Sequence, residues 1–248
     1  MISYSFLLEK SISFENVKPT TVLKKIRFLK VQFDAEIEGW ELPAFRGAVI
    51  QKAGEQHITF HNHINDQEVI YRYPVIQYKR IGRNPALVCV DFGVDEVHHF
   101  FNNRNLDIEI SGRKLSLNVK YLQMNQFTLQ VWEKSFTMRL TQWLALNQEN
   151  YAKFRATTDE FVHLTLLEGI LKANIISFAK GIGWDVDRDI RLRIDTIDKS
   201  RLITYKEQKL MAFDVTFRTN VFLPDYLGLG KGVSHGFGTV RQVRTEPK

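Results

Sequence analysis

The chain has 248 residues, of which 44% are hydrophobic and 25% charged, with a formal net charge of +6 and an isoelectric point near 9.3. These values are typical of a globular protein of one large or two small domains, and the positive charge favours nucleic acid as a partner. The single cysteine, Cys89, excludes an intramolecular disulfide and lies in an apolar run that predicts burial. The N-terminus lacks a basic leader, and the apolar runs are shorter than the ~20 residues that cross a bilayer. We therefore expect a cytoplasmic protein with no membrane partner.

The first half of the chain predicts a β-α-β-β-α-β order. Apolar and charged residues alternate over residues 20–37, as in a half-buried strand, and residues 41–54 then read as a short helix. Residues 69–82 and 85–93 read as two strands joined by a turn. A short helix at 94–103 and strands within 106–122 complete the order of a ferredoxin-like unit.

The second half repeats this pattern less regularly. Residues 135–147 read as a strand, and residues 157–183 as a long helix capped by Thr158. Strands follow at 189–198, 209–223 and 238–244. The sequence therefore predicts an α+β fold of tandem ferredoxin-like (RRM-like) domains with antiparallel sheets. We expect residues 1–125 to form the N-terminal domain and residues 126–248 the C-terminal domain.

A glycine-rich stretch, GLGKGVSHGFG, occupies residues 228–238 between the last two predicted strands. It is not a nucleotide P-loop, because Lys231 is followed by Gly232 and then by a strand instead of by Ser or Thr and a helix. Its glycines also lack the spacing of a dinucleotide fingerprint. Exposed amides flanked by cations could instead lie against a phosphodiester backbone.

This stretch resembles the C-terminal glycine-rich loop of the CRISPR-associated endoribonucleases that cut precursor CRISPR RNA within its repeats. Those proteins belong to the repeat-associated mysterious protein superfamily, and their loop has the form G-h-G-K/R-x-x-x-x-G-h-G. The resemblance implies tandem ferredoxin-like domains and an RNA-binding loop. The residues expected to bind RNA are Gly228, Gly230, Lys231, Gly232, His235, Gly236, Gly238 and Arg241. We expect a bulky residue at Gly230 or Gly236 to weaken RNA binding more than it lowers thermal stability.

Three histidines, His57, His61 and His63, follow the first predicted helix. The contiguous tripeptide HNH is not evidence for the nuclease family of that name, whose residues are dispersed. Three interpretations stay open: acid–base catalysis, a solvated loop, and a metal site in which His57 and His61 share a helical face. The extended character of Ile58–Phe60 disfavours the metal site, and we expect no bound metal.

The resembling family cuts RNA without metal or cofactor. The 2′-hydroxyl attacks the adjacent phosphorus, leaving a 2′,3′-cyclic phosphate and a 5′-hydroxyl, and the protein supplies a base, an acid and a cation. Its catalytic histidine commonly follows the first helix, which implies His63 or His61, with His63 preferred. Tyr73 and Lys79 are the candidate partners, with Tyr71 as a further tyrosine.

The sequence thus predicts a metal-independent endoribonuclease of CRISPR repeat RNA. A non-catalytic RNA-binding subunit of the same superfamily is the alternative, and the histidine cluster favours the enzyme. A phosphate-binding metabolic enzyme is disfavoured because the chain has no cofactor motif. The expected partners are repeat RNA and other CRISPR-associated proteins, and the chain is expected to be a monomer or homodimer.

Overall fold

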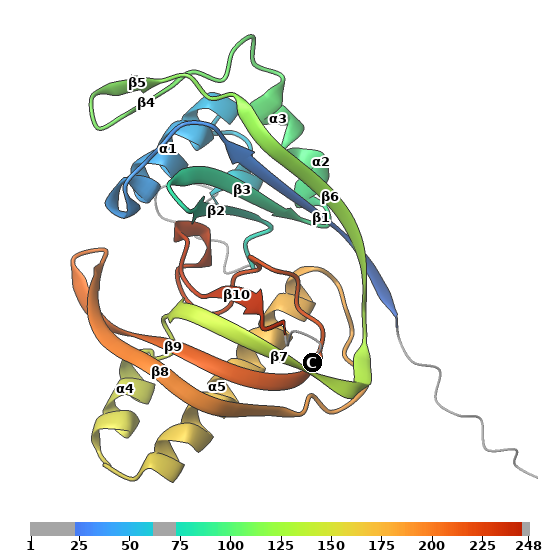
Figure 1. Ribbon diagram of the computed structural model, residues 1–248, viewed down its shortest axis with the longest axis vertical. Coiled ribbons are helices and arrows are strands. Elements are labelled where there is room, and N and C mark those ends of the chain that lie inside the picture. Colours follow the sequence, from blue (N-terminus) through green and yellow to red (C-terminus); the bar gives the residue numbers. More distant parts are fainter. Residues whose placement is uncertain (1–22, 62–72, 245–248) are drawn as a thin grey trace, which may run out of the picture.

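The computed structural model describes residues 23–61 and 73–244. Within these ranges the chain forms two four-stranded sheets, which lie one above the other in Figure 1. Each sheet is antiparallel and has the strand order of a ferredoxin-like fold. The α+β class and the tandem ferredoxin-like arrangement expected from the sequence are confirmed.

The first unit follows the predicted β-α-β-β-α-β order, with sheet order β2-β3-β1-β6. Two short helices, α2 and α3, take the place of the second helix, and a small β4–β5 hairpin precedes β6. The elements are β1 (Lys24–Phe33), η1 (Gly39–Glu41), α1 (Leu42–Ala53), η2 (Ile58–Phe60), β2 (Ile76–Ile81), β3 (Asn84–Val90), α2 (Gly93–Glu96), α3 (His98–Phe101), β4 (Ile108–Ile110), β5 (Arg113–Leu115) and β6 (Val119–Leu129).

The second unit has sheet order β10-β7-β9-β8. Two helices separate its first two strands, and the shorter of these was not expected from the sequence. Between β9 and β10, where the fold would place a second helix, the chain forms the glycine-rich loop with one 3₁₀ turn, η3. The elements are β7 (Val131–Trp143), α4 (Gln148–Arg155), α5 (Glu160–Gly181), β8 (Leu192–Tyr205), β9 (Gln208–Val221), η3 (Val233–His235) and β10 (Thr239–Gln242).

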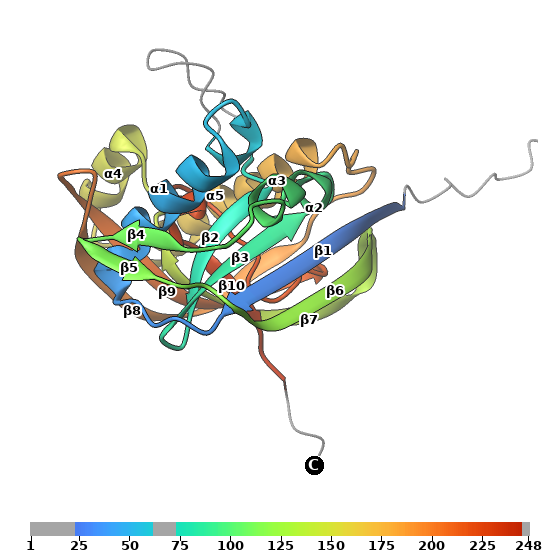
Figure 2. The same ribbon diagram turned by 90° about the horizontal axis from the view of Figure 1, so that it is seen from above.

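Gln130 alone separates β6 from β7, so one long ribbon runs from the first sheet into the second (Figures 1 and 2). In Figure 2 this ribbon runs along one side of the molecule, and the helices lie toward the other. The two sheets are therefore connected without a flexible linker.

Two hydrophobic cores hold the molecule together. On one face of the first sheet, Phe33 meets Phe45 of α1 and Phe100 of α3 in edge-to-face contacts with ring centroids 6.1 and 6.0 Å apart. Cys89 is fully buried there, as predicted. The opposite face of the same sheet joins a larger core that also contains the second sheet and α5. Because this core is shared, the two units are packed against each other.

Helix α5 is long and apolar enough, by length and composition alone, to cross a membrane. The sequence expectation concerned uninterrupted apolar runs, and polar residues such as Glu168 and Lys172 interrupt the apolar run in this helix. In this structure Leu167, Leu171, Ile175 and Phe178 of α5 are fully buried in the shared core. The hydrophobicity of this helix is thus used in packing against the second sheet.

Candidate functional site

The glycine-rich loop, residues 228–238, lies between the two sheets and contacts β2 of the first unit (Figure 1). The Tyr73 hydroxyl donates to the Gly228 carbonyl at 2.8 Å, and the Gly228 amide donates to Gln77 Oε1 at 2.9 Å. Within the loop, the Leu229 amide donates to the Gly238 carbonyl at 2.8 Å. The loop is thus fastened to the N-terminal unit by buried hydrogen bonds.

Its glycines are required by contacts inside the protein. Four of them have positive φ, and Gly230 and Gly236 are at +91° and +90°. A Cβ on Gly230 would lie 2.7 Å from Trp143 Nε1, and one on Gly236 would lie 2.4 Å from Leu42 Cδ2. The expectation that these glycines exist for close approach of RNA therefore has to be corrected: a side chain there would first disturb the fold.

Gly238 offers a test of this packing role, because a Cβ there would lie 1.8 Å from the Leu229 carbonyl oxygen. Gly82 is a matched control: its φ of +62° equals the +61° of Gly238 within a degree, but a Cβ on Gly82 would have no other atom within 4 Å. We expect Gly82→Ala to cost about 1–2 kcal/mol for the left-handed backbone alone. Gly238→Ala is expected to lower the melting temperature much further in thermal unfolding. Equal shifts for the two variants would contradict the packing role.

Tyr73 is a structural residue in this arrangement. Its side chain is buried, its ring packs on Phe178, and its hydroxyl accepts a hydrogen bond from Gln77 while donating to Gly228. Burial raises the pKa of this phenol well above its ordinary value. The proposed catalytic role of Tyr73 is therefore replaced by a role in holding the loop. Gln77, which holds the Tyr73 hydroxyl, is likewise fully buried.

A cavity of about 720 Å³ opens beside the loop, between the two sheets. Both units contribute basic or titratable side chains to this cavity. They are Lys79 and Arg80 from β2, Arg139 from β7, His235 from η3 and Arg241 from β10. No carboxylate is among the described residues that line it. Such a cavity favours an anionic ligand.

The arginines on the second sheet lie side by side. Arg139 and Arg241 are register partners on β7 and β10. Arg241 stacks over the Tyr226 ring, with its Cζ 4.3 Å from the ring centroid, and Arg139 is 3.5 Å from the Asp198 carboxylate. Neighbouring cations repel each other unless an anion lies between them, and planar guanidinium groups match phosphate geometry.

Lys79 is the most perturbed cation of the cavity. Its side chain is only 2% exposed, and its Nζ donates to Thr239 Oγ1 at 3.2 Å. Burial lowers the pKa of Lys79 from 10.5 to about 7, and no carboxylate offsets this burial. A lysine with this pKa can accept or release a proton near neutrality, so the sequence-based choice of Lys79 gains a physical basis.

Replacing Lys79 by methionine is expected to stabilise the fold. Because the pKa is lowered on folding, the unfolded chain binds an extra proton between about pH 7 and 10.5. Stability should therefore rise with pH over this interval in the wild type, and this contribution should vanish in Lys79→Met. The gain in the free energy of unfolding of Lys79→Met over the wild type is largest at or below pH 7, on the order of 4 kcal/mol. It shrinks toward pH 10. Thermal melts across pH measure this effect, and Lys25→Met, which changes an exposed lysine of β1, is the control. A lower melting temperature for Lys79→Met at pH 6 would contradict the assignment.

His61 contacts Arg46, which is electrostatically coupled to Tyr205 near the cavity. His61 ends the η2 turn after α1, and its backbone carbonyl accepts from Arg46 Nη2 at 3.3 Å. Burial raises the pKa of Tyr205, and the positive charge of Arg46 acts against this rise. The Tyr205 hydroxyl lies 3.4 Å from His235 Nδ1. The His235 ring lines the cavity. Tyr205 is therefore the residue of this group that contacts a cavity-lining side chain, His235.

The ring orientation of His61 identifies its basic nitrogen. His61 Nε2 lies 2.8 Å from the Glu55 carbonyl oxygen, and a carbonyl can only accept. The proton is thus on Nε2, and Nδ1 is the basic nitrogen of the neutral ring.

Arg46 was not anticipated from the sequence. Burial lowers the pKa of its guanidinium, and its Nε is buried with no hydrogen-bond partner among the described residues. The signal in the sequence is an arginine next to Phe45, on the apolar side of α1. Arg139 and Tyr205 were also missed, because their place at the cavity depends on pairing between strands far apart in the sequence.

The remaining predicted residues divide into two groups. Lys231 is exposed at the loop tip, where its amide approaches the Leu144 carbonyl at 3.4 Å, and Gly232 has a left-handed backbone with φ of 72°. His63 and Tyr71 lie outside the described residues. The structure therefore brings Lys79, His235 and Arg241 together at one cavity and places Lys231 outside its lining.

Comparison with protein families gives two adjoining matches. The Cas6b N-terminal domain family matches residues 24–128, and the Cas6b C-terminal domain family matches residues 130–243. Among curated proteins, the uncharacterized protein MJ0978 of Methanocaldococcus jannaschii is 35% identical over 104 residues, which are 42% of this chain and 69% of that protein.

Solved structures agree with these matches. A crystal structure of Cas6b superimposes with a TM-score of 0.76 at 25% identity, covering 89% of this chain and 100% of the other. A structure described as the CRISPR RNA processing endoribonuclease Cas6b has a TM-score of 0.66 at 22% identity, with the same coverage. The product of a Cas6-related gene from Pyrococcus furiosus shares the fold, with a TM-score of 0.50 at 11% identity over 90% of this chain and 100% of that one.

Proposed function

Because the chain belongs to the Cas6b family, we propose that it is an endoribonuclease that cuts precursor CRISPR RNA within its repeats. A solved relative with the same fold carries the name of a CRISPR RNA processing endoribonuclease. The observation that carries the proposal is the cavity between the sheets, which is lined by cations from both units and by no carboxylate of the described residues. A phosphodiester backbone matches that charge.

In the proposed reaction the RNA supplies its own nucleophile. A base removes the proton of the 2′-hydroxyl, the 2′-oxygen bonds to the adjacent phosphorus, and the bond from phosphorus to the 5′-oxygen breaks. An acid protonates the departing 5′-oxygen. The products are a 2′,3′-cyclic phosphate and a 5′-hydroxyl, and no water or metal-bound nucleophile takes part in this step.

We assign the base or acid role to His61 or His63, since a histidine is the side chain whose ordinary pKa suits proton transfer near neutrality. His61 is supported by its place at the end of η2, where its carbonyl accepts from Arg46. Lys79 is assigned to the charge that develops on the phosphoryl oxygens, because a bound phosphate would favour its protonated form.

Holding the RNA is assigned to the arginines of the cavity and to the exposed loop tip. Arg80, Arg139 and Arg241 line the cavity and are assigned to phosphates of the RNA, and Tyr226 beneath Arg241 is assigned to base stacking. Lys231 adds a cation at the rim. These contacts position the RNA and carry no base-specific information by themselves.

The proposal is tested with a labelled repeat RNA from the CRISPR array of the source genome, under single-turnover conditions and in excess EDTA. We expect one dominant cut, a product ending in a 2′,3′-cyclic phosphate, and no cutting of a scrambled RNA of equal length. Tight binding of the repeat without cutting would instead support the alternative of a non-catalytic RNA-binding subunit. Loss of cutting in EDTA that returns with added metal would contradict metal independence.

A further inference from the structure

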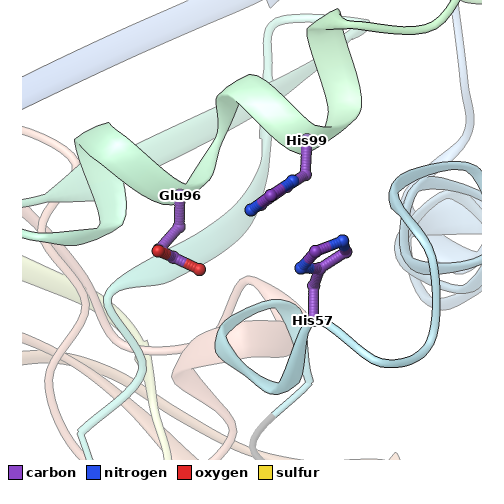
Figure 3. A group of neighbouring side chains, drawn as sticks. All are labelled: His57, Glu96 and His99. Atoms are coloured by element: carbon purple, nitrogen blue, oxygen red, sulfur yellow. The ribbon is translucent and has the colours of Figure 1, made fainter.

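Three half-buried side chains, His57, Glu96 and His99, converge on the outer side of the N-terminal unit (Figure 3). His57 lies in the turn between α1 and η2, Glu96 ends α2, and His99 is in α3. One potential ligand atom from each residue lies within 4.8 Å of the other two. The His57 and His99 rings are stacked, with centroids 3.5 Å apart and planes 19° apart.

This arrangement is unfavourable if the histidines carry charge. Two positively charged rings with centroids 3.5 Å apart would repel each other. A neutral imidazole keeps a lone pair on one nitrogen, which is the form that binds a metal ion. The Glu96 carboxylate supplies negative charge beside both rings.

We propose that His57, Glu96 and His99 bind a divalent transition-metal ion, with zinc as the ion that fits best. Two imidazole nitrogens and one carboxylate oxygen form an established zinc ligand set, which leaves a fourth position for water. Calcium and magnesium prefer sites made of oxygen alone. The Thr59 hydroxyl lies 3.4 Å from Glu96 Oε2 and can donate to it, which orients the carboxylate.

Bound zinc would join two parts of the chain that are about forty residues apart and would fix the turn that leads from α1 to His61. None of the three ligands lines the basic cavity. The site is therefore separate from the proposed cutting of RNA, and the two proposals can fail independently. Sequence reasoning paired His57 with His61, whereas the fold places it against α3.

The test uses the full chain without an affinity tag, treated with chelator and then dialysed. Isothermal titration with ZnCl₂ is expected to show one equivalent bound, and zinc is expected to raise the melting temperature. Titration with CoCl₂ should give the visible absorption of a low-coordinate nitrogen and oxygen site. His99→Ala should weaken zinc binding at least about tenfold, and Glu96→Gln should weaken it in the same direction.

Glu109→Gln is the matched control for Glu96→Gln, because this exposed carboxylate of β4 is not one of the three ligands. It should bind zinc as the wild type does. Melting curves in EDTA show whether the variants are folded, and they should coincide with that of the wild type within a few degrees. Absence of stoichiometric binding by the wild type, or equal affinities for wild type, His99→Ala and Glu96→Gln, would overturn the proposal.

Discussion

Replacing His61 by alanine is expected to lower the single-turnover rate of repeat cutting by roughly 10²–10⁴-fold, the usual contribution of a general acid or base. The dissociation constant of the RNA should change by less than about twofold, because many lysines and arginines share the neutralisation of phosphate. The prediction depends on the position of His61 at the end of η2, where Arg46 contacts its carbonyl. The rate and the dissociation constant should be measured at the same salt concentration.

His63→Ala has to be measured beside His61→Ala, since the sequence prefers His63 and this residue lies outside the described residues. A loss of rate in one variant and not in the other identifies the catalytic histidine. Arg241→Ala serves as the contrasting variant: it should weaken binding and reduce the salt dependence by about one ion. If both histidine variants cut at near wild-type rates, the catalytic assignment is wrong and the RNA-binding subunit becomes the better proposal.

The fold was largely predictable because short stretches of the sequence indicate its strands and helices. Alternation over residues 20–37 marked β1, and Pro43 and Gly54 bracketed α1, which spans Leu42–Ala53. The apolar residues Leu167, Leu171 and Ile175 marked the buried side of α5. Its cap was misplaced by one residue, since the Asp159 carboxylate, and not Thr158, accepts from the Phe161 amide at 2.8 Å.

The candidate site was less predictable because its contacts join distant parts of the chain. The loop motif identified a loop that lies beside the basic cavity, but the need for glycine at Gly230 and Gly236 comes from Trp143 and Leu42. A sequence cannot show such neighbours. Tyr73 read as an exposed strand residue because no local signal indicates that the loop covers it.

The burial of Lys79 could not be predicted from the sequence either, because it depends on a distant part of the chain. The edge strand β2 is covered by η3, and the Lys79 side chain is buried there. The burial gives Lys79 the perturbed pKa that makes it a candidate for catalysis. The choice of Lys79 stays a prediction, and the physical reason for it became visible only in the fold.

The central claim is that the RNA provides the attacking group within the basic cavity. It is tested most directly with a repeat RNA that carries a single 2′-deoxy nucleotide immediately upstream of the cut. We predict that the protein binds this RNA with the affinity of the unmodified repeat and leaves it uncut, because the hydroxyl that attacks the phosphorus is missing. A deoxy substitution one nucleotide downstream should be cut normally. Cutting of the upstream-substituted RNA at a near wild-type rate would contradict the account, since water or a protein group would then be the nucleophile.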